Sequence, residues 1–203
     1  MVTKYSTLEN VKEVKINILK SVFIGNGMEV DNHKQGLEFL TKIKHMYPDA
    51  NHQCWAYIID ENKVCDDDGE PFGTAGTPIL NVLKRNDLNN TMVIVTRYFG
   101  GKKLGVSGLI AAYREVAEKL IANSTVIERK PGYVFDITCD YNYANKITSK
   151  KDTRLKLLKN EYTEDVSLMI FIELEAVSEY EFDFSNNNIK INSKVESITS
   201  YQN

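Results

Sequence analysis

A run of glycines between a strand and a helix is the feature of this sequence that most limits its fold. Met92 to Phe99 is a β-branched, apolar run that predicts a buried strand, and Gly100-Gly101 follows directly. From Val106 to Ala122, apolar residues recur at helical spacing, which predicts an amphipathic helix of about four turns. The chain therefore passes from a strand into a helix through a glycine-rich connection. We expect a sheet covered by helices.

The rest of the first 130 residues predicts further strands and helices of the same kind. Their expected order is a strand or hairpin at 14–27 ending in a Gly25-Asn26-Gly27 turn, a helix at 32–46 capped by Asp31, a strand at 51–60, a loop at 61–78 and a helix at 78–84.

Lys130-Pro131-Gly132 is the best linker candidate, because proline and glycine together punctuate the chain after a helix. Beyond it we expect a strand at 133–140, a helix at 143–159, a strand or hairpin at 162–177, a short helix at 179–184 and a strand at 190–200. A β-α-β-β-α-β order is the ferredoxin-like pattern. The sequence therefore predicts an α+β protein with one domain at 1–130 and a smaller one at 131–203.

The composition is that of an ordinary globular protein, with 42% hydrophobic and 26% charged residues. No apolar stretch is long enough for a membrane span, and the start lacks the apolar run of a secretory signal. The three cysteines never form C-x-x-C, which is typical of free thiols rather than disulfides or zinc ligands. We therefore expect a cytoplasmic protein without a membrane partner, and its oligomeric state stays open.

The charge balance limits how the protein could bind nucleic acid. Residues 1–130 carry 17 Lys and Arg against 16 Asp and Glu, and residues 131–203 carry 8 against 12. Neither part has the general basic excess of proteins whose affinity comes mainly from phosphate contacts. Any nucleic-acid binding should therefore be local or weak.

An acidic, glycine-containing segment from Asp66 to Pro78 is the first candidate for a functional site. Its carboxylates could bind Mg²⁺ or Ca²⁺, although their spacing departs from the calcium-loop motif. Alternatively, it is a solvated turn that caps the following helix. We predict a binding role without a bound metal or other cofactor. The candidate residues here are Asp67, Asp68, Gly69, Glu70, Gly73, Thr74 and Gly76.

The glycine-rich segment after the 92–99 strand is the second candidate. Backbone amides freed by glycine, the positive end of a helix and two lysines could together bind phosphate or another anion. Alternatively, the glycines only permit close packing. The candidate residues here are Arg97, Tyr98, Gly100, Gly101, Lys102, Lys103, Gly105 and Gly108. The Arg97 guanidinium could pair with Asp67, Asp68 or Glu70, or with an incoming anion.

His52 and Cys54 share one face of the expected 51–60 strand, because side chains two residues apart point the same way. This spacing raises the possibility of a Cys/His nucleophile. The alternative, a core histidine and a buried free thiol, is the commoner arrangement. We predict no catalytic residue here, and an enzymatic activity stays open.

Three motifs carry a resemblance to a known family. Residues 52–56 fit H-x-C-x-A, residues 67–78 fit D-D-G-E-P-x-G-T-A-G-x-P, and residues 97–108 fit R-Y-F-G-G-x-x-L-G-x-x-G, continued by Leu109 to Tyr113. With these motifs the sequence resembles the IMPACT/YigZ family from about Lys15 to Lys130. The resemblance implies an N-terminal α/β sandwich domain like those of a ribosomal protein and the GHMP kinases. It also implies a second, ferredoxin-like domain similar to domain V of elongation factor G.

The same resemblance implies a non-catalytic regulator of translation or of a stress response. Its partners would be RNA, the ribosome or a translation-associated protein. Two alternatives remain: a nucleotide- or phosphate-binding protein with kinase-like or hydrolase activity, and an adaptor that binds only proteins. We further expect the acidic and glycine-rich segments to meet in space and form one recognition face.

Overall fold

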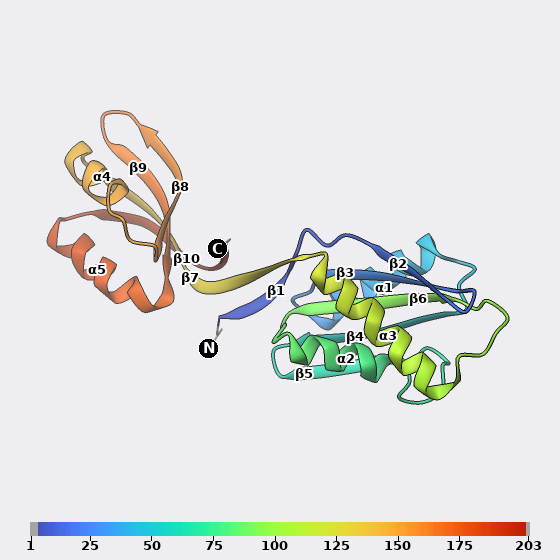
Figure 1. Cartoon of the computed structure of the whole chain (residues 1–203). Coiled ribbons are helices and arrows are strands. Elements are labelled where there is room, and N and C mark those ends of the chain that lie inside the picture. Colours follow the sequence, from blue (N-terminus) through green and yellow to red (C-terminus); the bar gives the residue numbers. More distant parts are fainter. Residues whose placement is uncertain (1–3, 202–203) are drawn as a thin grey trace. The chain divides into compact units, whose positions relative to one another are not determined.

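The structure is a computed structural model that describes residues 4–201. It contains two compact units, each described by itself below (Figure 1). The N-terminal unit is Tyr5–Ile127, and the C-terminal unit runs from Glu128 onward and includes Lys4. Each unit has its own sheet and helices, so the predicted α+β class is confirmed. The domain limits 1–130 and 131–203 stay predictions.

The N-terminal unit is a five-stranded antiparallel sheet with helices on both faces. Its strand order is β2-β3-β6-β4-β5. The helices α2 and α3 share one apolar core with the sheet, and α1 packs on a second core on the other face (Figure 1). The elements of this unit are β1 Tyr5–Glu9, β2 Val14–Ile18, β3 Ser21–Glu29, α1 His33–Met46, β4 His52–Ile59, β5 Asn62–Asp66, α2 Gly76–Arg85, β6 Thr91–Tyr98 and α3 Gly105–Ala122.

The central strand β6 is buried on both faces, at every position except its last residue. Such a strand needs apolar side chains in succession, which the Met92 to Val95 run supplies. The helices expected at 32–46, 78–84 and 106–122 and the strands expected at 51–60 and 92–99 are confirmed as α1, α2, α3, β4 and β6.

Three expectations for this unit are wrong. Gly25-Asn26-Gly27 lies inside β3, where it pairs with β6, and forms no turn. Position 25 needs glycine because a Cβ there would lie 2.7 Å from Val116 of α3. Those glycines permit close helix packing. The cap of α1 is Asn32 rather than Asp31, since the Asn32 side chain accepts from the Gln35 amide at 3.0 Å. The expected loop at 61–78 contains β5, which pairs with β4.

The C-terminal unit has the β-α-β-β-α-β order of the ferredoxin-like pattern. Its antiparallel strands lie in the order β10-β7-β9-β8, and α4 and α5 pack on the same apolar core. The elements are β7 Thr125–Cys139, α4 Tyr141–Thr148, β8 Leu155–Tyr162, β9 Val166–Glu173, the 3₁₀ turn η1 Leu174–Ala176, α5 Val177–Asn186 and β10 Lys190–Tyr201.

Two expectations for the C-terminal part are also wrong. Lys130-Pro131-Gly132 lies inside β7 and is no linker loop; the glycine is needed because its Cβ would lie 2.2 Å from the Ile172 carbonyl oxygen. The helix expected at 143–159 ends at Thr148, and β8 begins at Leu155. Beyond the helix end, the Asp152 carboxylate accepts from the Arg154 amide at 2.9 Å, a local turn that takes the place of helical hydrogen bonding at 152–154.

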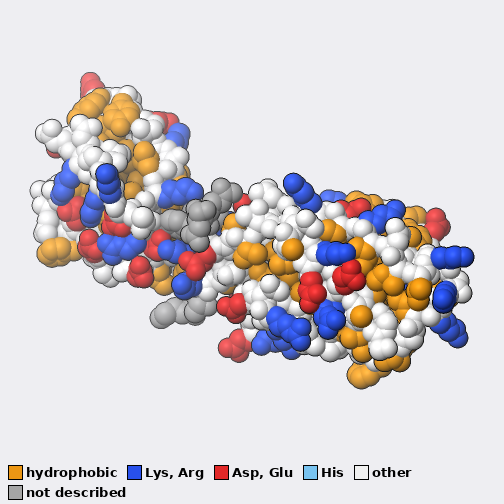
Figure 2. All heavy atoms as spheres, viewed as in Figure 1, with side chains coloured by type: hydrophobic (Ala, Val, Ile, Leu, Met, Phe, Trp, Pro, Cys, Tyr) orange, Lys and Arg blue, Asp and Glu red, His pale blue; other side chains and the backbone are white. Residues whose placement is uncertain are grey.

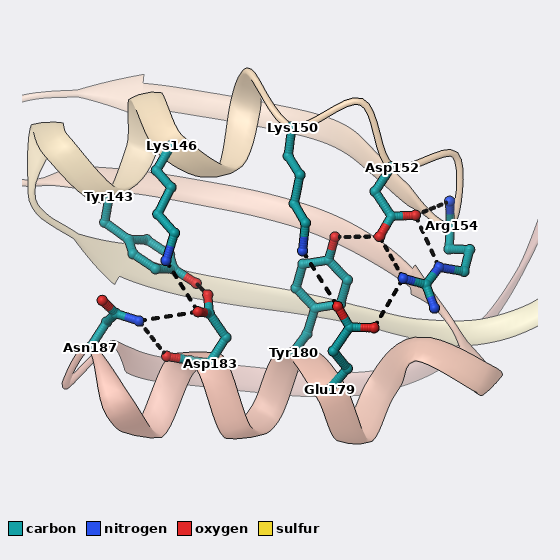
Figure 3. Close-up of polar contacts among 9 residues, drawn as sticks. All are labelled: Tyr143, Lys146, Lys150, Asp152, Arg154, Glu179, Tyr180, Asp183 and Asn187. Carbon is teal, nitrogen blue, oxygen red and sulfur yellow. Dashed lines mark hydrogen bonds and ion pairs between the residues drawn. The ribbon is translucent and has the colours of Figure 1, made fainter.

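Two clusters of polar residues, nine residues in all, join α4 and the α4–β8 connection to α5 (Figure 3). The Arg154 guanidinium binds the Asp152 carboxylate through Nε at 3.0 Å and through a terminal nitrogen at 2.8 Å. The Tyr180 hydroxyl of α5 donates to the same carboxylate at 2.9 Å. One turn later, Asp183 accepts from the Tyr143 hydroxyl of α4 at 2.6 Å. These contacts hold both helices in place over the sheet.

Acid should weaken the cluster around Asp152. The hydrogen bonds from Arg154 lower the pKa of Asp152 below its ordinary value of 3.8. A carboxyl whose folded pKa is lowered stabilises the fold fully above its unfolded pKa and loses that contribution as pH falls through the folded pKa. The excess unfolding free energy of the wild type over Asp152→Asn should therefore be constant above about pH 5 and shrink in acid. Urea denaturation from neutral to acidic pH measures it.

The matched control for this experiment is Asp165→Asn, because Asp165 is an exposed aspartate of the same unit. The unfolding free energy of Asp165→Asn should differ little from that of the wild type at every pH. If the wild type kept its full excess of unfolding free energy over Asp152→Asn in acid, the ionic role of Asp152 would be contradicted.

Candidate functional site

The Asp67 carboxylate organises the acidic loop, residues 66–76. One carboxylate oxygen accepts from the Gly73 amide at 2.7 Å, and the other accepts from the Ala75 and Gly76 amides at 2.9 and 2.8 Å. Because α2 begins at Gly76, this negative charge lies at the positive end of a helix, where it is stabilising. The lone pairs that a cation would need are therefore largely occupied by backbone amides.

Asp68 fastens the acidic loop to β4. Its carboxylate accepts from the Gln53 amide at 2.6 Å, and its backbone carbonyl lies 2.8 Å from Nδ1 of His52. A weaker ion pair joins Asp68 to Lys44 at 3.9 Å. Among residues 4–201, no three His, Cys, Asp or Glu side chains are grouped as metal ligands would be.

A buried ion pair connects the acidic loop to the end of β6. The Arg97 guanidinium lies 2.5 Å from Oε1 of Glu70, and the two side chains are only 6% and 4% exposed. The Tyr113 hydroxyl of α3 donates to the same oxygen at 2.7 Å. Arg97 also lies over the rings of Phe23 and Phe99, at 5.4 and 5.5 Å from their centroids. Glu70 thus joins the loop, the sheet and α3.

Cys54 is buried beneath the same loop and is no nucleophile in this arrangement. Its thiol donates to the Asp67 carbonyl at 3.0 Å and lies 3.3 Å from the Tyr113 hydroxyl. Burial raises the pKa of the Cys54 thiol well above its usual range, so the thiol is protonated at neutral pH. Cys54 and His52 both contact backbone carbonyls of the acidic loop, which is a structural role.

The glycine-rich segment, residues 99–108, lies directly on the β2–β3 turn. A Cβ on Gly100 would lie 2.0 Å from the Lys20 carbonyl carbon, so only glycine fits there. The Gly100 amide donates to Oγ of Ser21 at 3.1 Å. Gly101 and Gly105 have φ of +82° and +74°, values that favour glycine. The segment therefore has a fixed course against the backbone of Lys20.

The helix α3 begins at Gly105 without a side-chain cap. Leu104 precedes it, and the Leu104 side chain provides no hydrogen-bond acceptor for the first turn. The first amides of a helix have no partner within the helix and carry partial positive charge. Lys102 and Lys103, both exposed, come just before this helix start. An anion would be favoured there.

The two segments meet around a pocket of about 420 Å³, within the range of about 300 to 1,000 Å³ typical of ligand sites. Figure 2 shows basic and hydrophobic side chains next to one another at the end of the N-terminal unit where α3 begins. Five residues predicted from the sequence line the pocket: His52, Glu70, Arg97, Lys103 and Gly105. The sequence analysis did not single out the other six: Asn51, Pro71, Phe99, Leu104, Val106 and Leu109.

The remaining predicted residues lie around the pocket or away from it. The Thr74 hydroxyl donates to the Pro71 carbonyl at 2.6 Å and shapes the loop. Tyr98 follows Arg97 in β6, and alternation therefore turns its side chain toward the α1 face. The same alternation could have identified Phe99, since it shares the face of Arg97. Gly69 and Gly73 have φ of +84° and +74° and form bends in the acidic loop.

The comparisons with known proteins agree with the motifs. Residues 19–121 match the family model of the Impact N-terminal domain. The IMPACT family member YvyE of Bacillus subtilis is 37% identical, over 92% of this chain and 89% of its own. The IMPACT family member YigZ of Escherichia coli is 28% identical, over 89% of this chain and 91% of its own. This chain belongs to the IMPACT family.

A solved structure has a similar fold over nearly the whole chain. The crystal structure of a hypothetical protein gives a TM-score of 0.66 at 26% identity and covers 94% of this chain and 97% of its own. The fold of the IMPACT family member is thus shared with an experimentally determined structure.

Removal of Glu70 should destabilise the N-terminal unit strongly. In Glu70→Ala the Arg97 charge stays buried without its partner, which typically costs about 3 to 5 kcal/mol. Tyr113→Phe removes one hydrogen bond to Glu70 and should cost about 1 kcal/mol. Chemical denaturation measures both losses of unfolding free energy.

Glu115→Ala, at an exposed ion pair on α3, is the control and should change the unfolding free energy by less than about 1 kcal/mol. Equal losses in Glu70→Ala and Glu115→Ala would contradict the role given to Glu70.

Proposed function

We propose that this protein is a cytoplasmic, non-catalytic regulator of translation that binds RNA or the ribosome at the face formed by the two segments. The link to translation is what the resemblance to the IMPACT family implies, and it is supported by this chain's membership of that family. The observation that carries the binding role is the pocket itself, because it joins the uncapped start of α3, Lys103 and the acidic loop in one place. A helix start with nearby lysines favours phosphate.

The charges around the pocket support binding of an anion. Lys20, Lys102 and Lys103 are exposed and lie on neighbouring turns. The Asp67 carboxylate is held by three backbone amides and Glu70 by Arg97, so these acidic groups are already compensated. The local field is therefore more favourable to phosphate than the net charge of the chain suggests.

The contacts of the candidate residues support a binding role rather than catalysis. Cys54 is a buried, protonated thiol, and His52 contacts a loop carbonyl. In this proposal Arg97 positions the acidic loop, while the lysines and the first amides of α3 meet the ligand. A translation-associated protein is the alternative partner for the same face.

Lys102→Ala/Lys103→Ala should weaken binding to purified ribosomes and lower its dependence on salt. Each lost phosphate contact reduces the slope of log affinity against log salt by about 1, so the double variant should lose about 2. Sedimentation or filter binding between roughly 50 and 200 mM salt measures the slope.

The matched control is Lys34→Ala/Lys42→Ala, which removes two exposed lysines from α1 on the opposite face of the sheet. Its affinity and slope should equal those of the wild type. If the two double variants behaved alike, or if affinity did not fall with salt, the phosphate-contact role of this face would be refuted.

A further inference from the structure

One wall of the pocket is apolar and aromatic, a property that phosphate binding alone does not require. Phe99, Leu104, Val106 and Leu109 line this wall, and Pro71 closes it from the acidic loop. The Phe99 ring is 45% exposed and Val106 is 60% exposed. Water is in contact with these side chains in the free protein, so a ligand that covered them would gain from their burial.

A second aromatic ring lies on the adjoining loop. Phe72 follows Pro71 directly, and its side chain is 100% exposed. A fully exposed phenylalanine gives no stability to the fold, because it buries no surface. Exposed aromatic side chains such as Phe99 in the pocket wall and Phe72, which follows the pocket-lining Pro71, are typical of surfaces on which bases stack.

The segment that leads into α3 also brings positive charge to the pocket. Lys103 lines it, and the uncapped start of α3 provides amides at Gly105 and Val106. An apolar wall and positive charge within one cavity match a ligand that has a flat apolar part and an anionic part. A nucleotide has both, since its base has two π faces and its phosphate is charged.

We propose that the pocket binds one nucleotide of single-stranded RNA, with the base against Phe99 and the phosphate at the start of α3 beside Lys103. This inference rests on the proposed function and specifies its ligand. In a duplex the base faces are covered by their neighbours, so they cannot reach a concave wall. Single strands expose their bases and can stack them on aromatic side chains. Phe72 then provides a platform for an adjacent base.

Fluorescence anisotropy with three RNAs of equal length tests the inference. The probes are a single-stranded oligouridine of about ten nucleotides, an abasic strand with the same backbone, and a base-paired duplex. Wild-type protein should bind oligouridine most tightly. Phe99→Ala should weaken oligouridine binding about 5- to 150-fold, the range for loss of one stacked base, and leave abasic binding unchanged.

Two further variants separate stacking from loss of structure. Phe72→Ala removes a side chain without packing contacts, so its fold should be intact, and it too should weaken oligouridine binding selectively. Phe182→Ala, at a ring 70% exposed on α5 of the other unit, is the control and should bind as the wild type does.

The possible failures have different meanings. Equal affinity for the abasic strand or the duplex, or unchanged oligouridine binding in both Phe99→Ala and Phe72→Ala, would overturn the single-nucleotide inference and leave the lysine-dependent function standing. Absence of binding to every RNA and to ribosomes would overturn the proposed function itself. Loss of ribosome binding in Phe99→Ala with unchanged affinity for oligouridine would place a protein against the ring and overturn the inference.

Discussion

The buried ion pair of Glu70 and Arg97 is the interaction on which the rest of the site depends. Glu70 belongs to the acidic loop, Arg97 to the end of β6, and Tyr113, which donates to the same carboxylate, to α3. A buried charge is tolerated only when it is paired and hydrogen-bonded, so each partner fixes the place of the others. This one carboxylate therefore holds the acidic loop over the sheet and closes one side of the pocket.

Glycine packing determines where the other side of the pocket lies. The glycines of β3 allow α3 to approach the sheet closely, and Gly100 allows the chain after β6 to lie on the β2–β3 turn. Together they place the first turn of α3 and its lysines opposite the acidic loop. Because of this close approach there is no room for a side chain at these positions. Both the fold and the pocket therefore require glycine there.

Much of the N-terminal fold could be predicted because its periodicities are strong. The β6 strand, the glycine connection and α3 follow from local pattern alone.

The site could be predicted less fully. That the acidic loop and the glycine-rich segment meet is a hypothesis from the sequence, and the pocket that both segments line agrees with it. For the ion-pair partner of Arg97, the sequence predicts only that it is Asp67, Asp68 or Glu70. The tertiary structure decides which of these carboxylates lies within reach, and it is Glu70. The position of Lys20 could not be predicted for the same reason, because only the tertiary structure brings the β2–β3 turn against Gly100. In the C-terminal part, the chain makes a local turn at Asp152, where the sequence predicts a helix.

The central claim is that both segments form one recognition face. Backbone amide chemical shifts of ¹⁵N-labelled protein, followed during titration with a short single-stranded RNA, test it most directly. The account predicts that the largest shifts occur together in residues 69–76 and 99–108, with the first amides of α3 among them. Shifts confined to one segment, or centred on the α1 face or the C-terminal unit, would contradict it.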